Sequence, residues 1–436
     1  MKIRRLKIDS YRHLENLEFD FTYQSGEKKG QPLEKICLIG QSATGKTSIL
    51  ELIKDAYTLF VKFGDDSSNV LTATNGNNTK KIIPLEYRII FSEADFIHQD
   101  LEINVEHSSI NLIQKNQEIN KHYPTDILLY YFTSEIIASS NFDIITQNPT
   151  SKNLNKGEDW QAPIEKNIDF SIIKNTYEVL EFNEKTNELI WNYFLQDIAK
   201  YREKLTQKGA DLINMGLHAD YKRIASEMEQ WKIDNPNPSE LLGNNILNPI
   251  LKKLHLEVDP VDTSSHISLK HINNNKPIPT KSLSTGSKQL ILNSLPLYKL
   301  ETKETIILID EPERSLYPDV QIELMDHYQR LAPEAQFIVA THSPFIAAAF
   351  EPDERFILYF DDEGKVAVKK GSSPIGDDPN DILKSDFGLT HLMNEKGIDA
   401  YRQYIRLKEE MASEKDSEKK DKLMLEVVTL GNKYKF

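Results

Sequence analysis

The nonapeptide GQSATGKTS, Gly40 to Ser48, limits the folds open to this chain more than any other stretch. It fits the pattern G-x-x-x-x-G-K-[ST] and follows an apolar segment, EKICLIG at 34–40, that has the character of a buried strand. The residues after it carry apolar side chains at helical spacing. A glycine loop between a strand and a helix N-terminus points several N–H donors at one spot, as phosphate oxygens require. We therefore predict an α/β fold with a phosphate-binding loop made of Gly40, Gln41, Ser42, Ala43, Thr44, Gly45, Lys46, Thr47 and Ser48.

Within this loop two side chains have separate predicted roles. Lys46 would reach the β- and γ-phosphates of a nucleotide, and Thr47 would give its hydroxyl to Mg²⁺. The alternative is a plain turn between a strand and a helix.

A second segment, TIILIDEPE at Thr305 to Glu313, places two acids at the end of an apolar run. A parallel strand that ends in an acid presents the carboxylate at the carboxyl edge of the sheet, where ligands of open α/β folds bind. We predict that Asp310 belongs to the Mg²⁺ shell and that Glu311 orients and activates the attacking water. The alternative is that both are surface acids of an ordinary Asp-Glu-Pro turn.

A third segment, FIVATHSPF at 337–345, places His342 directly after another apolar strand. A lone histidine is more often a structural residue than a catalytic one. One that ends the strand following an Asp-Glu pair is nevertheless well placed to contact a γ-phosphate. The candidate catalytic residues are therefore Lys46, Glu311 and His342.

The stretch LSTGSKQ, Leu283 to Gln289, is too polar and too broken by glycine for a core, and it precedes a predicted helix that Ser284 would cap. With the segments above, it makes the chain resemble ABC-type ATPases of the RecF/SMC/OLD group. GQSATGKTS resembles their Walker A motif, LSTGSKQ their LSxGxxQ signature and THSP their histidine switch. IDEPERSLYP resembles their Walker B motif with its D-loop, and IRRLKIDSYRHLENLEF their opening strands.

The resemblance implies that ATP and Mg²⁺ are bound and that two copies of the chain sandwich the nucleotide. Ser284 and Gly286 would then contact the γ-phosphate of ATP held by the other subunit. Arg12 and His13 would line the adenine and ribose, although His13 stands where the group often has glycine. The glutamine loop of the group is missing after the strand at 126–132, where Ser134 or Glu135 are the candidate substitutes.

The predicted fold is an α/β, ABC-type P-loop ATPase head, with a mixed sheet flanked by helices, a mainly helical insertion and a helical C-terminal tail. Residues 1–135 would form the N-terminal part of the head, 136–260 a mobile loop and helical arm, 261–375 the rest of the head, and 376–436 the tail, which would dock a partner or a further subunit.

Three details of this division follow from local patterns. Between Ser139 and Lys166 the composition shifts to Asn, Ser, Gly and Pro, which predicts a loop. Residues 187–215 predict one long helix, and NNNKP at 273–277 predicts a hairpin turn. The mixed charges of 413–422 predict a solvated linker within the helical tail.

Charge and composition narrow the function classes. The chain has 53 basic and 67 acidic residues, a net charge of −14, so no global positive field attracts nucleic acid or an anionic membrane, although a local basic groove for DNA remains open. The single cysteine, Cys37, excludes an intramolecular disulfide. No apolar run reaches 18 residues and no secretory leader is recognisable, which predicts a cytoplasmic protein without a membrane anchor.

The tail segment DPNDILKSDFGLTHLMN, 378–394, resembles the end of ATPase subunits in bacterial anti-phage systems such as Septu (PtuA), and PARIS (AriA) is a similar arrangement. This resemblance implies a sensor and regulator ATPase, in a homodimer or higher oligomer, that controls a separate nuclease, of the HNH type or alternatively the Toprim type. No acidic pair typical of Toprim chemistry follows the ATPase motifs, so we predict that the chain is not itself a nuclease. The alternatives are a RecF-like DNA-repair ATPase that clamps DNA and, less favoured, a transporter subunit.

Overall fold

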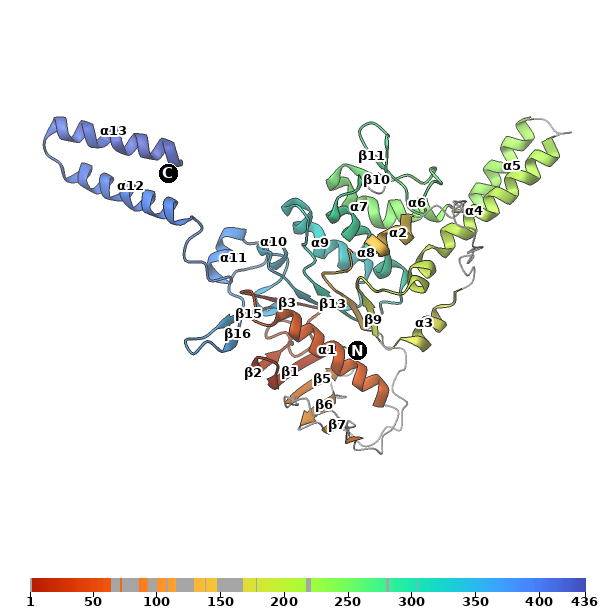
Figure 1. The fold of residues 1–436 in the computed structure, drawn as a ribbon, viewed down its shortest axis with the longest axis horizontal. Helices are drawn as coiled ribbons and strands as arrows, with labels where there is room; N and C mark the ends of the chain where they lie inside the picture. Colours follow the sequence, from red (N-terminus) through yellow and green to blue (C-terminus); the bar gives the residue numbers. More distant parts are fainter. Residues whose placement is uncertain are drawn as a thin grey trace, which may run out of the picture.

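The computed structural model describes residues 2–63, 71–72, 86–92, 100–106, 109–114, 129–137, 139–146, 168–177, 179–216, 221–279, 282–303 and 305–436. Its centre is a seven-stranded sheet in the order β16-β15-β3-β14-β13-β8-β9 (Figure 1). Neighbouring strands run parallel, except that β16 is antiparallel to β15. The strands are β3 Lys35–Gly40, β8 Leu129–Phe132, β9 Val179–Phe182, β13 Ile306–Asp310, β14 Gln336–Ala340, β15 Arg355–Phe360 and β16 Val366–Lys370.

The alternation of side chains along these strands creates two cores. On β3, Ile36 and Leu38 belong to one core, and Cys37 and Ile39 belong to the other. Both faces are apolar because a parallel sheet of this kind is covered on both sides. This explains why the strands predicted at 34–40 and at the start of 305–313 and 337–345 are continuous apolar runs, and these predictions are confirmed.

One face is covered by α1 (Lys46–Phe63) and a second sheet. That sheet has the order β2-β1-β5-β6-β7-β4, and its pairings are antiparallel. Buried α1 side chains such as Ile49 and Ile53 share a core with Leu6 of the second sheet and Leu38 of the central sheet, so α1 lies between the two sheets (Figure 1). The strands are β1 Lys2–Tyr11, β2 Leu14–Asp20, β4 Leu71–Thr72, β5 Glu86–Ser92, β6 Asp100–Glu106 and β7 Ser109–Gln114.

The other face is covered by helices and a small three-stranded sheet of order β10-β11-β12. The hairpin predicted at 273–277 is confirmed, because β11 and β12 pair antiparallel on either side of it. The elements are α2 Ser139–Thr146, α3 Phe170–Thr176, α6 Pro238–Leu242, a π-helix Gly243–Leu247, α7 Asn248–Leu251, β10 Leu256–Val258, β11 Leu269–His271, β12 Pro277–Ile278, α8 Thr285–Lys299, α9 Pro318–Leu331 and α10 Pro344–Ala347.

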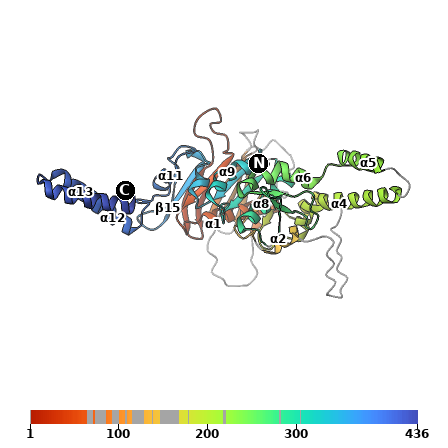
Figure 2. The ribbon, with the colours of Figure 1, turned by 90° about the horizontal axis from the view of Figure 1, so that it is seen from above.

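The helical insertion projects from one end of the molecule as α4 (Glu188–Gly216) and α5 (Tyr221–Asp234) (Figures 1 and 2). The long helix predicted at 187–215 is confirmed with a shift of one residue and the predicted length of 29 residues. The segment predicted as helical also contains β9, which pairs with β8 at the edge of the central sheet.

The prediction of a loop from Ser139 to Lys166 is wrong for its first residues, because α2 occupies Ser139–Thr146. The rest of the predicted loop, 147–166, lies outside the described residues. Tertiary contacts explain the helix. The Asn141 amide donates to the carbonyls of Ile136 at 3.0 Å and Asn183 at 2.6 Å, and it accepts from the Trp191 indole at 3.2 Å. Asn141 is buried, so these contacts, and not local propensity, hold the helix in place.

The tail consists of α11 (Pro379–Ser385) and a hairpin of α12 (Glu395–Ser413) and α13 (Ser417–Tyr434) at the end opposite the insertion (Figure 2). Asp386, just after α11, forms a fully buried ion pair with Arg355 of β15 at 3.1 Å, which anchors α11 to the head. The linker predicted at 413–422 is too long, because Asp416 caps α13 and only 414–416 separate the two helices. No helix within the described ranges combines the length and the apolar character needed to span a bilayer.

Candidate nucleotide-binding site

The P-loop (residues 40–48) joins β3 to α1 through a tight, strained turn. Gly40 has φ +143°, and a Cβ there would lie 2.0 Å from the carbonyl oxygen of Leu358 on β15, so a side chain cannot be accommodated. The chain then takes left-handed conformations at Ala43 and Gly45. The buried Thr44 hydroxyl donates to the Gln41 carbonyl at 2.8 Å and closes the turn, while Ser42 is exposed.

Lys46 begins α1 and is buried under the P-loop. Its ammonium donates to the carbonyls of Gly40 at 3.0 Å and Gln41 at 2.9 Å. Burial lowers the pKa of Lys46 to about 8, against the opposing effect of the Asp310 and Glu311 carboxylates. At pH 7 the ammonium is therefore mainly charged, and a bound anion would offer it stronger, charge-assisted partners than backbone carbonyls.

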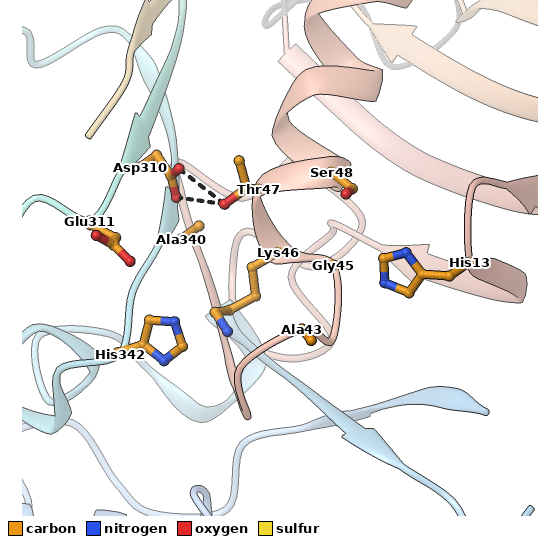
Figure 3. Close-up of a pocket in the computed structure, with 10 residues that line it drawn as sticks. All are labelled: His13, Ala43, Gly45, Lys46, Thr47, Ser48, Asp310, Glu311, Ala340 and His342. Atoms are coloured by element: carbon orange, nitrogen blue, oxygen red, sulfur yellow. Dashed lines mark hydrogen bonds between the residues drawn. The ribbon is translucent and has the colours of Figure 1, made fainter. Parts of the chain in front are cut away.

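Asp310 ends β13 beside the start of α1. The Thr47 hydroxyl donates to its two carboxylate oxygens, at 3.2 and 3.0 Å (Figure 3). Burial raises the pKa of Asp310 to about 6, while the Thr47 hydrogen bond lowers it, so the carboxylate is mainly ionised at pH 7. Adjacent ligands of an octahedral Mg²⁺ lie about 2.9 Å apart, given metal–oxygen distances of about 2.0–2.1 Å. The hard oxygen atoms of Thr47 and Asp310 fit this requirement.

These groups open into one pocket of about 380 Å³ (Figure 3). Strand order explains the convergence, because β3, β14 and β13 are neighbours and end at the same edge of the sheet. The pocket is lined by His13, Ala43, Gly45, Lys46, Thr47, Ser48, Asp310, Glu311, Ala340 and His342. All of these except Ala340 are residues that the sequence predicted for the site, although their chemical roles stay predictions.

Two pocket residues sit opposite the P-loop. Glu311 takes a left-handed conformation with φ +49°, and its N–H donates to the Ala340 carbonyl at 2.9 Å, so the loop after β13 is held against β14. His342 is exposed beside it. Partial desolvation, and then the positive charge of Lys46, lower the pKa of His342, so its imidazole is neutral at pH 7.

Arg12 and His13 separate in the structure. His13 lines the pocket. Arg12 does not, because its guanidinium donates to the Ser48 hydroxyl at 3.3 Å, pairs with Glu51 on α1 and lies over the ring of Tyr11. Of the two residues predicted to line adenine and ribose, the structure brings only His13 to the pocket wall.

The signature segment (Leu283–Gln289) starts α8 and does not line the pocket of its own chain in the described structure. Ser284 is exposed and caps α8, accepting the N–H of Ser287 at 3.1 Å. Gly286 is buried, and a Cβ there would lie 2.4 Å from the Ser315 carbonyl oxygen, so the close approach of α8 to the loop after β13 requires glycine.

Sequence reasoning assigned no role to two residues of this region. The Gln289 amide donates to the carbonyls of Glu311 and Pro312, both at 3.3 Å, and so ties the signature helix to the loop that carries Glu311. Glu313 accepts the N–H of His342 at 2.8 Å. The only sequence signals were that Gln289 ends the signature segment and that Glu313 is a further acid near Glu311. The glutamine-loop candidates Ser134 and Glu135 are not among the residues lining the pocket.

The P-loop sheet, the helices that cover it, the helical insertion and the helical tail agree with the α/β architecture that the sequence predicted for a P-loop ATPase head. Residues 1–347 match the protein family described as AAA ATPase domain, and the chain belongs to this family of ATPases.

The chain is also similar to two individual relatives and to one solved structure. The chain is 20% identical over 414 residues to the Retron Vc95 probable ATPase of Vibrio cholerae serotype O1 biovar El Tor, covering 88% of this chain and 78% of the relative. It is 29% identical over 121 residues to the Septu protein PtuA of Bacillus thuringiensis, covering 27% of this chain and 31% of the relative. The SMC head domain from Thermotoga maritima superposes with a TM-score of 0.40 at 11% identity, covering 86% of this chain and all of that one.

Proposed function

We propose that the chain binds and hydrolyses ATP with Mg²⁺ in the pocket around Lys46. The observation that carries the proposal is the convergence of Lys46, Thr47, Asp310, Glu311 and His342 on that one pocket. Phosphoryl transfer is accelerated mainly by positioning the reacting groups and by stabilising negative charge on the phosphate. Each of these side chains can do one of the two.

The residues would divide the work as follows. Lys46 binds the β- and γ-phosphates, and Thr47 and Asp310 hold the Mg²⁺, which supplies neutralisation of the phosphate charge. Glu311 orients the attacking water and accepts its proton. His342 donates a hydrogen bond to the γ-phosphate.

We further propose that the signature segment completes the site of a second copy of the chain. Ser284 is exposed at the N-terminus of a 15-residue helix and does not line its own pocket in the described structure. The free N–H groups and the dipole at such an end favour an anion. Ser284 and Gly286 would therefore meet the γ-phosphate held by the partner, and ATP would hold the dimer together.

Mixing two inactive variants tests this arrangement. Ser284→Arg blocks the signature, and Lys46→Ala disables the P-loop, so each homodimer should be inactive. A mixed dimer has one intact site, built from Lys46 of one chain and Ser284 of the other, and one doubly broken site. We expect ATPase activity to reappear on mixing, measured as phosphate release.

Differential tags on the two variants show how many mixed dimers have formed, and mixing two separately tagged Lys46→Ala preparations is the control. Mixed dimers without activity would show either that the two sites do not work independently or that the signature segment is only a helix cap.

The names of the two relatives support a role in anti-phage defence. We propose that the chain is the sensor and regulator ATPase of such a complex, controlling a separate nuclease, of HNH type in preference to Toprim type, through ATP-dependent assembly. A RecF-like DNA clamp is the competing outcome. Copurification of a stoichiometric nuclease would favour the defence regulator. DNA-stimulated ATP turnover by the isolated chain would favour the DNA clamp.

The α12–α13 hairpin is the proposed docking element. Ile382 is buried and Phe387 packs against the core of the head, so α11 is the part of the tail that packs on the head. Beyond it, the apolar side chains of Met424, Leu425 and Val428 on α13 are exposed. A partner or a further subunit would cover them.

Removing residues 394–436 should leave a soluble chain with ATPase activity within about twofold of the full chain, because every pocket residue and the Arg355–Asp386 pair remain. It should lose the copurifying nuclease or the higher oligomer, measured by light scattering and mass spectrometry. Leu425→Glu should have the same effect, and Lys422→Glu, an exposed change on the same helix, should not. Unaltered assembly in the truncated chain would show that the hairpin has another role.

A further inference from the structure

Glu313 joins the two loops that carry the chemistry of the site. The acidic loop (residues 311–317) follows β13, and the histidine loop (residues 341–343) follows β14. At their start, the Glu311 N–H donates to the Ala340 carbonyl at 2.9 Å. Two residues further on, the Glu313 carboxylate accepts the N–H of His342 at 2.8 Å. This second contact is a charge-assisted hydrogen bond to the backbone of the residue whose side chain faces the pocket.

A third contact links the same two loops beyond His342. The Ser343 hydroxyl donates to the Gln321 side-chain oxygen at 2.5 Å, and the Gln321 amide donates to the Leu316 carbonyl at 2.7 Å. Ser343 also caps α10 by accepting the N–H groups of Phe345 and Ile346. The histidine loop is thus held on both sides of His342, and Glu313 supplies the contact at His342 itself.

The position of Glu313 separates it from the acids that face the pocket. Asp310 and Glu311 line the pocket, whereas Glu313 is not among its lining residues. One Glu313 oxygen is inaccessible to solvent and the other is engaged by His342. The carboxylate is therefore turned toward the histidine loop and away from the space where a nucleotide would lie.

We propose that Glu313 is a positioning residue for His342, which accepts the His342 N–H and so sets where the imidazole stands against the γ-phosphate. The inference rests on the proposed function, because it takes His342 as a contact of that phosphate. Misplacing such a group by about 1 Å can cost on the order of 100-fold in rate.

Two substitutions of Glu313 separate hydrogen-bond acceptance from charge. Glu313→Ala removes the acceptor and should lower kcat about 10- to 100-fold while changing the KM for ATP little, because the phosphate cradle is untouched. Glu313→Gln keeps an acceptor oxygen and should restore kcat to within about threefold of wild type. If the glutamine variant is as slow as the alanine variant, the negative charge itself is required and the positioning role is wrong.

A double-mutant cycle tests whether Glu313 acts through His342. In a His342→Ala background, Glu313→Ala should change kcat by less than about twofold, because the side chain that it positions is gone. A purely structural role for Glu313 predicts instead that the two losses multiply. Loss of activity in His342→Ala but not in Glu313→Ala would overturn this inference and leave the proposed function standing. Full activity in His342→Ala would overturn this inference together with the γ-phosphate contact proposed for His342, and would leave ATP hydrolysis in the pocket standing.

Hydrogen exchange of the His342 amide provides a readout that needs no ATPase activity. In the full nucleotide-free chain, we expect this amide to be protected in wild type and in Glu313→Gln, and to exchange at least about tenfold faster in Glu313→Ala. Equal exchange in wild type and Glu313→Ala would overturn the inference whatever the kinetic result.

Discussion

Replacing Lys46 with alanine should lower ATP hydrolysis by at least about 100-fold, the loss expected when a preorganised donor to a reacting phosphate is removed. Lys46 is buried beneath the P-loop, and its ammonium is held by the Gly40 and Gln41 carbonyls. The chain would thus lose the cation at the place where the β- and γ-phosphates are expected. Phosphate release at saturating ATP and Mg²⁺, with ATP binding by calorimetry, measures the effect.

Lys54→Ala is the matched control, because Lys54 lies on the same helix but pairs with Glu181 of β9 at 3.1 Å and does not line the pocket. It should leave turnover within about twofold of wild type, as expected for a partly exposed ion pair outside the site. Wild-type affinity and turnover in Lys46→Ala would exclude the pocket at the P-loop as the nucleotide site.

Secondary-structure elements that depend on residues close together in the sequence were predictable. The buried strand β3, the P-loop and α1 follow each other without interruption, so apolar period, glycine spacing and helix start all lie within one short window. The same holds for β13 and β14, whose apolar runs end in Asp310 and just before His342. Because parallel strands end at one edge, their order alone brings these residues together.

Elements that are stabilised by contacts with residues far away in the sequence were missed. β9 has four residues and, within the described part of the chain, pairs with β8 alone, which lies about 50 positions earlier. α2 begins with Ser-Ser-Asn and depends on the contacts of Asn141 with Asn183 and Trp191. Neither dependence leaves a periodic pattern in the short segment itself.

The distinction between local patterns and long-range contacts also explains why the motifs did not reveal the contacts of some residues around the site. Arg12 was predicted to line the adenine and ribose, and in the structure its guanidinium contacts Ser48 and Glu51 on α1. Gln289 and Glu313 act on the backbone of other loops, at the Glu311 carbonyl and the His342 amide. A backbone atom is the same in every residue type, so no sequence pattern records such a contact.

Replacing Glu311 with glutamine should slow hydrolysis by about 10²- to 10⁴-fold, the range for loss of a general base, while leaving ATP binding intact. Glu311 lines the pocket next to His342, and its backbone is fixed by Ala340 on one side and Gln289 on the other. Glutamine has nearly the same shape and should keep that backbone in place. The change therefore removes proton acceptance from water without disturbing Lys46, Thr47 or Asp310.

If two copies of the chain sandwich ATP, slow hydrolysis must also prolong the dimer, since the nucleotide that holds it is no longer consumed. Glu311→Gln should accordingly become dimeric with ATP and Mg²⁺, whereas wild type under turnover should dimerise less, measured by light scattering with a single-turnover assay in parallel. Glu323→Gln, an acid on α9 that pairs with Lys253 outside the pocket, is the matched control and should behave as wild type. Wild-type turnover in Glu311→Gln would assign the attacking water to another residue. A slow variant that stays monomeric would support the role proposed for Glu311 in hydrolysis. It would contradict the proposal that ATP holds two subunits together.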